Sequence, residues 1–218
     1  MNSELINRIL TSLILLPILI GSLFYSGYYF IIFLSLVYFI SFYEIFKNTK
    51  NLMFNIIANI VLIFSLYAFY NLRGDTNYSL ITLYWILSVN FLSDIGGYTF
   101  GRLFKGKKLT KISPNKTYSG SIGSIFFSSS SLPLFEVLQI FLLDEKLIYF
   151  YQLKYFILSI LISIVCQLGD LYVSFWKRKI NIKNISNILP GHGGVLDRID
   201  GLIFVLIFIF LIKKIGLM

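Results

Sequence analysis

The sequence predicts an all-α fold, a polytopic integral membrane helical bundle of about seven transmembrane helices. Hydrophobic residues make up 57% of the 218 residues, and charged residues only 13%. The hydrophobic residues form long runs of about 20 residues, the length that a helix needs to cross a bilayer. Most of the net positive charge lies in two segments between these runs, 102–116 and 177–200. A chain of this length leaves no space for a separate soluble domain, so we expect residues 1–218 to form one membrane-embedded domain.

Each expected helix corresponds to one apolar run. The first run follows Arg8 like a secretory signal, but it lacks a convincing cleavage site and a second run follows at once, so we expect a retained helix. The short connection at Gly27 makes the first two runs a hairpin. The segment Ser128 to Ser131, followed by Pro133, interrupts the fifth run with residues that favour close helix packing. The expected spans are residues 9–26, 28–46, 53–71, 79–100, 121–143, 154–176 and 201–217.

Two smaller features concern helix packing and redox chemistry. Gly97 and Gly101 have the GxxxG spacing, which favours a helix contact and, with the long apolar spans, leaves a homodimer open. Cys166 is the one cysteine of the chain, so an intramolecular disulfide is excluded. Since it lies in an apolar run, we expect it to be a small buried core residue.

The net charge of +9 has a distribution typical of membrane topology. With seven spans, 14 Lys and Arg residues fall on one side of the membrane and five on the other. Positive charge favours the cytoplasmic side, so we expect the N-terminus and both charged loops to face the cytoplasm from the inner or plasma membrane. The same loops attract anionic lipid or phosphate, and we expect no nucleic-acid partner.

The first charged loop, residues 93–123, carries features of a phosphate site. Asp94 lies in the end of a span, and a cationic stretch then leads to Ser113-Pro114-Asn115-Lys116-Thr117 in an expected turn. Hydroxyls, a lysine and backbone amides flanked by glycine are what a phosphate-binding turn needs. A positively charged membrane anchor with an ordinary turn would show the same pattern, so both interpretations stay open.

The second charged loop, residues 167–201, carries more specific signals. Asp170 lies near the end of a span, where an acid usually has a function. If the helix continues, Asp170, Ser174 and Lys177 lie on one face. Pro190-Gly191 predicts a turn, and Gly193-Gly194 leaves the backbone free to approach a ligand. Between them, His192 is more often a hydrogen-bonded loop residue than a ligand.

Two aspartates stand at the expected start of the last helix, near Val195. Asp197 and Asp200 are three positions apart, so both carboxylates project from one face of the first turn. Paired carboxylates with open coordination positions suit Mg²⁺ that holds the phosphates of a substrate. Acids also favour helix N-termini through the helix dipole, but this alternative explains one aspartate better than two.

These motifs resemble the signature of the phosphatidate cytidylyltransferase family, also called CDP-diacylglycerol synthases. The resemblance rests on a 27-residue segment, Ser174-x-x-Lys177-Arg178, then Lys183, then Pro190-Gly-His-Gly-Gly-x-x-Asp197-Arg198-x-Asp200. Upstream segments fit as well: Gln167-x-Gly169-Asp170-Leu171, Ser113-Pro114-x-Lys116-Thr117 with Gly120, and Asp94 with Gly101-Arg102. The long segment is highly specific, whereas the piece around Lys116 would be weak alone.

The resemblance implies an enzyme that transfers a cytidylyl group from CTP to phosphatidic acid, giving CDP-diacylglycerol and pyrophosphate for phospholipid synthesis. It implies a catalytic half at residues 91–218, after N-terminal spans at residues 1–90. The implied ligands of Mg²⁺, with a second cation left open, are Asp170, Asp197 and Asp200. The implied catalytic residues are Asp170, Ser174, Lys177, Arg178, Lys183, His192, Asp197, Arg198 and Asp200. The implied substrate-binding residues are Asp94, Ser113, Lys116, Thr117, Gly193 and Gly194.

Three positions depart from the family pattern, which usually has acids where this chain has Ser119, Val173 and Asn184. We expect Asn184 to lie outside the metal ligands. Two alternatives stay open: a CTP-dependent transferase acting on another lipid phosphate, and an ion-coupled transporter. A transporter predicts acids near the middle of the bilayer and paired broken helices. Here most acids lie at span ends, with Glu136 deeper and Glu44 near a span end.

Overall fold

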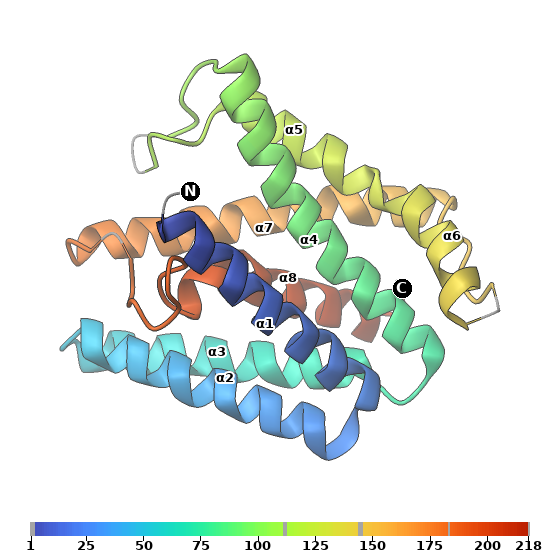
Figure 1. Cartoon of the computed structure of the whole chain (residues 1–218), viewed down its shortest axis with the longest axis horizontal. Helices are drawn as coiled ribbons and strands as arrows, with labels where there is room; N and C mark the ends of the chain where they lie inside the picture. Colours follow the sequence, from blue (N-terminus) through green and yellow to red (C-terminus); the bar gives the residue numbers. More distant parts are fainter. Residues whose placement is uncertain (1–2, 111–112, 144–145, 183, 218) are drawn as a thin grey trace.

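The computed structural model describes residues 3–110, 113–143, 146–182 and 184–217, and these ranges contain α-helices and no β-strand (Figure 1). The all-α prediction is therefore confirmed. Lys183, a predicted site residue, lies outside the described residues. The helices are α1 (Ser3–Tyr25), α2 (Gly27–Asn48), α3 (Leu52–Arg73), α4 (Asn77–Phe104), α5 (Tyr118–Ser129), α6 (Ser131–Leu143), α7 (Leu153–Lys179) and α8 (Leu196–Lys214).

Among the residues that the structure describes, five helical segments are long and apolar enough to cross a membrane, so the chain is an integral membrane protein. They are Gly27–Asn48, Leu52–Arg73, Asn77–Phe104, Tyr118–Phe141 and Leu153–Lys179, and a shorter apolar segment is Leu10–Tyr25. Each expected span overlaps a helix. The last one, α8, has an apolar middle and charged residues in its first and last turns, as its sequence LDRIDGLIFVLIFIFLIKK shows.

The interrupted fifth span forms two helices, α5 and α6, which join at Ser130. The hydroxyl group of Ser131 donates to the carbonyl of Ser128 at 2.7 Å and accepts the indole N–H of the buried Trp85 at 3.0 Å. Pro133 sits in the first turn of α6, where its missing N–H has no helical partner to lose. Ser131 therefore packs against Trp85 and hydrogen-bonds a backbone carbonyl at the helix break, as predicted for the serines of this segment.

The GxxxG pair makes a helix contact inside the chain. A Cβ added at Gly97 would lie 2.7 Å from Ser124 Oγ, and one at Gly101 would lie 3.1 Å from Thr117 Oγ1. Small residues here let α5 pack directly on the C-terminal half of α4. The predicted helix contact is confirmed, and because α5 covers this face, a homodimer would need another surface.

Helix α8 lies in the middle of the bundle and packs against α7, α3 and α4. Val205 and Ile209 on α8 are fully buried. Figure 1 shows that the segment between α4 and α5 and the segment between α7 and α8 lie at the same end of the bundle, near the N-terminus. The prediction that the two charged loops share one end is confirmed, and this end holds the candidate site.

Candidate active site

The first part of the site is a group of three side chains from α4 and α7. Ligand atoms of Asp94, Cys166 and Asp170 all lie within 4.8 Å of one another. Asp94 is exposed, Asp170 is half-buried and Cys166 is fully buried. The thiol of Cys166 donates to Asp94 Oδ1 at 3.7 Å. Cys166 is buried as predicted, but it lies beside two acids and not only in an apolar core.

Asp200 joins this group from α8. Its carboxylate lies 3.7 Å from the Lys177 ammonium, and the next residue, Gly201, packs directly against Asp170. This approach depends on Gly201, because a Cβ there would lie 2.6 Å from Asp170 Oδ1 and 2.8 Å from Cys166 Sγ. Carboxylates so close together repel one another unless they share a proton or a cation. Asp94 and Asp170 therefore offer oxygen ligands that fit a hard divalent cation such as Mg²⁺, and Asp200 precedes the glycine that packs against them.

The first charged loop reaches this group through Lys116, whose ammonium lies 3.4 Å from Asp170 Oδ2. The predicted turn is confirmed, since the Lys116 N–H donates to the Ser113 carbonyl at 3.0 Å. Thr117 ends the turn as the N-cap of α5, accepting the N–H of Gly120 at 3.1 Å. Helix packing through α4 and α5 thus brings a lysine to acids that lie far away in the sequence.

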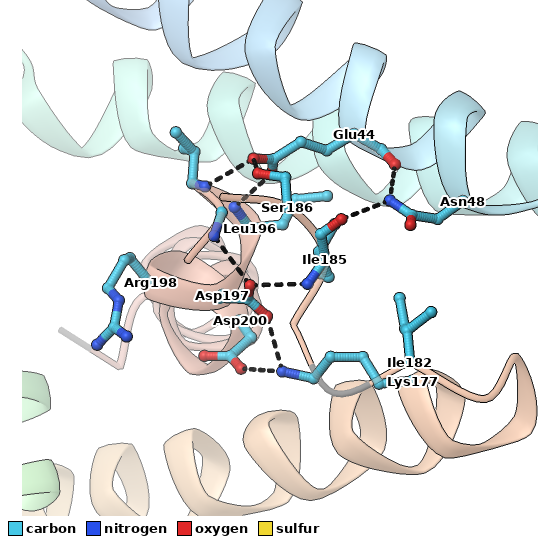
Figure 2. Close-up of polar contacts among 12 residues, drawn as sticks. Glu44, Asn48, Lys177, Ile182, Ile185, Ser186, Leu196, Asp197, Arg198 and Asp200 are labelled. Atoms are coloured by element: carbon cyan, nitrogen blue, oxygen red, sulfur yellow. Dashed lines mark hydrogen bonds and ion pairs between the residues drawn. The ribbon is translucent and has the colours of Figure 1, made fainter. Parts of the chain in front are cut away.

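Lys177 supplies a second cation from the last turn of α7. Its ammonium lies 3.0 Å from Asp197 Oδ1 and 3.7 Å from Asp200 Oδ2 (Figure 2). The predicted continuation of α7 to Lys177 is confirmed, and Asp197 and Asp200 do share one face of α8. Figure 2 also shows Arg198 pointing away from that face.

Asp197 contacts the loop before α8 as well as Lys177. Its Oδ2 accepts the backbone N–H of Ile185 at 2.8 Å and of Gly194 at 2.9 Å, while its Oδ1 faces Lys177. Only 7% of its side chain is exposed. These contacts make Asp197 an anchor for the loop before α8, and its expected role as a metal ligand stays a prediction.

The loop before α8 contains the predicted turn. The Leu189 carbonyl accepts the N–H of His192 at 2.9 Å and of Gly193 at 3.0 Å, and the Leu189 N–H donates to the Gly193 carbonyl at 2.8 Å. Gly193 has φ of +87°, which favours glycine. His192 Nδ1 lies 2.8 Å from Thr11 Oγ1 on α1. The backbone carbonyl of His192 accepts two N–H groups of Arg198. His192 thus has the hydrogen bonds expected of a loop residue.

The two adjacent glycines make space for carboxylates of the same chain. A Cβ at Gly193 would lie 2.9 Å from Asp197 Oδ2, and one at Gly194 would lie 2.6 Å from Glu44 Oε1. The sequence predicts that Gly193 and Gly194 let a ligand approach the backbone. Here the groups that approach the backbone are Asp197 and Glu44.

The other predicted residues lie near the site without entering the carboxylate group. Ser174 is half-buried on α7, and Arg178 donates to the Ile182 carbonyl at 3.1 Å. The three departures from the family pattern have separate surroundings: Ser119 donates to the Lys105 carbonyl at 2.8 Å, Val173 lines an apolar cavity, and Asn184 is exposed.

Sequence reasoning did not assign Cys166, Gly201 or Glu44 to the site. A signal existed only for Glu44, a charged residue in an apolar run, which is rare unless the charge is partnered. Cys166 and Gly201 carry no such signal because their importance comes from which side chains lie next to them.

Comparison with known proteins agrees with these features. A sequence model of the Cytidylyltransferase family matches residues 47–215, most of the chain. The chain belongs to this family. A phosphatidate cytidylyltransferase of Rickettsia conorii is 34% identical and the alignment covers 97% of this chain and 92% of that protein. One of Rickettsia felis is 35% identical over 94% of this chain and 91% of that protein. One of Helicobacter pylori is 38% identical over 59% of this chain and 45% of that protein.

Proposed function

We propose that this chain is a phosphatidate cytidylyltransferase, which transfers a cytidylyl group from CTP to phosphatidic acid and releases pyrophosphate. The observation that carries the proposal is the meeting of Asp94 and Asp170 with Lys116, beside the pair of Asp200 and Lys177, at one end of a membrane bundle. Phosphoryl-type transfer needs positive charge and in-line positioning more than covalent help from the protein. A site at the end of the bundle is where a lipid phosphate and a soluble nucleotide can meet.

An apolar cavity next to the acids supports a lipid substrate. It has a volume of about 150 Å³, lies between α3, α7 and α8, and has Asp200 in its wall. Its other lining residues include Ala58, Val61, Val173 and Phe204. We propose that it takes the part of an acyl chain next to the glycerol, which places the lipid phosphate beside Asp200 and Lys177.

We propose Mg²⁺ as the cation, held by Asp94, Asp170 and Asp200. When bound, it supplies the positive charge that brings the phosphates of both substrates together and stabilises the leaving pyrophosphate. Lys116 and Lys177 hold the carboxylates in place and add charge toward the phosphates. Arg178 and Arg198, both exposed at this end, are proposed to bind the triphosphate from the solvent side.

The activity is tested with purified protein in mixed micelles. We expect labelled CTP to give CDP-diacylglycerol only when phosphatidic acid and a divalent cation are both present, and chelation of the cation to stop the reaction. A panel of other lipid phosphates separates this function from a CTP-dependent transferase with another lipid substrate. Folded protein that forms no CDP-lipid and carries ions across liposome membranes would contradict the proposal in favour of transport.

We further propose that the end of the bundle with both charged loops faces the cytoplasm, on the basis of the charge asymmetry. Lys107→Cys and Asn184→Cys, both at exposed positions, should be labelled by a membrane-impermeant reagent from the cytoplasmic side only. Asp75→Cys, in the exposed connection between α3 and α4, should be labelled only from the opposite side. The unmodified chain, whose Cys166 is buried, measures the background. Labelling of positions 107 and 184 from different sides would contradict this topology.

A further inference from the structure

Glu44 on α2 is a fully buried carboxylate that contacts the start of α8. Its Oε1 accepts the Val195 N–H at 2.9 Å and the Ser186 hydroxyl at 2.5 Å, and its Oε2 accepts the Leu196 N–H at 2.9 Å (Figure 2). A buried charge needs such partners, because an unpartnered carboxylate away from water is strongly destabilising. Three donors converging on one carboxylate therefore make a specific attachment between α2 and α8.

This attachment replaces a missing helix cap. The first N–H groups of a helix have no partner within the helix, and a side chain at the N-cap position usually accepts from one of them. The N-cap residue of α8 is Val195, which has no side-chain acceptor, and no side-chain cap bond forms there. Glu44 accepts from Val195 and Leu196 in its place, and its negative charge also faces the positive end of the α8 dipole.

A second contact attaches the same loop to α2. Asn48, one helical turn after Glu44, donates its side-chain N–H to the Ile185 carbonyl at 2.7 Å and to the Glu44 carbonyl. The N–H of Ile185 donates to Asp197, which faces Lys177, and Lys177 also faces Asp200. Continuous polar contacts therefore lead from α2 to an acid of the candidate site.

We propose that Glu44 is a positioning residue of the enzyme: it fixes the N-terminus of α8 and, through the loop at residues 185–196, the direction of Asp200 and Lys177. The proposal rests on the proposed function for its catalytic consequence. Glu44 lies three residues before the segment matched by the family sequence model, and in the expected N-terminal spans at residues 1–90. A residue outside the expected catalytic half would thus control the geometry inside it.

The chain offers a matched control in Glu136 on α6. Its side chain is also buried, it accepts the Phe150 N–H at 2.7 Å, and it pairs with Lys146. It therefore anchors a loop through a backbone amide, as Glu44 does, but near the start of α7 at the opposite end of the bundle (Figure 1). Glu44→Gln and Glu136→Gln each turn one acceptor oxygen into an amide donor that faces existing donors.

The test combines hydrogen–deuterium exchange with kinetics on the purified full chain in mixed micelles. In Glu44→Gln we expect faster exchange in peptides covering residues 185–196, a fall of about 10- to 100-fold in kcat/KM for CTP, and a higher Mg²⁺ concentration for half-maximal activity. In Glu136→Gln we expect faster exchange only in peptides covering 146–152, with kinetics close to those of the unmodified chain.

Unchanged exchange at residues 185–196 in Glu44→Gln would overturn the proposal. So would an equal loss of activity in both glutamine variants without a shift in Mg²⁺ dependence, because that pattern reports general destabilisation. If Glu44→Gln does not fold, Asn48→Ala removes the second attachment and should give the same changes in smaller size, and normal behaviour of that variant would count against the proposal. If the unmodified chain forms no CDP-diacylglycerol, the proposed function fails, while the exchange result still decides whether Glu44 holds this loop.

Discussion

Asp170→Asn should lower kcat by at least about 100-fold while leaving the melting temperature nearly unchanged. Asparagine keeps the size of the side chain but removes the charge that faces Lys116 and that, with Asp94, fits a divalent cation. The Asp170 carboxylate lies close to that of Asp94, so loss of its charge also relieves repulsion between the two acids, and we expect little net change in stability. Turnover, the Mg²⁺ dependence of turnover and the melting temperature of the same preparation test this expectation.

Asp197→Asn is the informative comparison. The Asp197 carboxylate accepts two backbone N–H groups and pairs with the mostly buried Lys177. Removing one partner of a buried pair typically destabilises a protein by about 3–5 kcal/mol. We therefore expect Asp197→Asn to lower both the melting temperature and the turnover. Loss of turnover at unchanged stability in this variant would support the role of Asp197 as a metal ligand, and near-normal turnover in Asp170→Asn would exclude the site described here.

Gly201→Ala should reduce kcat by about 100-fold, although it adds one methyl group to a helix. The new Cβ would lie 2.6 Å from Asp170 Oδ1 and 2.8 Å from Cys166 Sγ, closer than real Cβ contacts. Either Asp170 turns away or α7 and α8 move apart, and a displacement of about 1 Å in a catalytic constellation can lower the rate 100-fold. Turnover measured per folded molecule tests this prediction.

Gly21→Ala on α1 is the matched control for that change. A Cβ at Gly21 would meet no atom within 4 Å, so the same substitution in another helix adds only helix propensity. We expect normal turnover in this variant. Normal turnover in Gly201→Ala as well would show that the close approach of α7 and α8 at Asp170 has no catalytic importance.

Most helices could be predicted from the sequence because each apolar run is long enough to cross a bilayer and must satisfy its own backbone hydrogen bonds there. The break at Ser128 to Ser131 was readable for the same reason, since hydroxyl side chains and a proline mark where a helix can be interrupted. The start of α8 near Val195 and the turn at Pro190-Gly191 followed from local residue preferences. By contrast, the spacing of Gly97 and Gly101 predicts a helix contact but does not indicate that α5 is the partner helix.

The candidate site was predictable only in part. The motif around Asp170, Asp197 and Asp200 identified the acids, and the structure packs Gly201, the residue after Asp200, against Asp170. The motif could not distinguish the surroundings of Asp200 from those of Asp197, because the i, i+3 spacing gives both carboxylates the same direction. Their surroundings differ because the loop at residues 185–194 folds back over Asp197 and donates two N–H groups to it.

The sequence by itself determined the membrane class, the family and the end of the bundle where the chemistry lies, because hydrophobic run length, a 27-residue motif and charge asymmetry are properties of the chain read along its length. Only the tertiary structure decided which acids meet. Asp94 joins Asp170 because α4 packs beside α7, and Asp200 joins them because Gly201 lets α8 approach. Glu44 contacts Leu196 across 152 residues of sequence, and such a contact depends on how helices pack rather than on any local pattern.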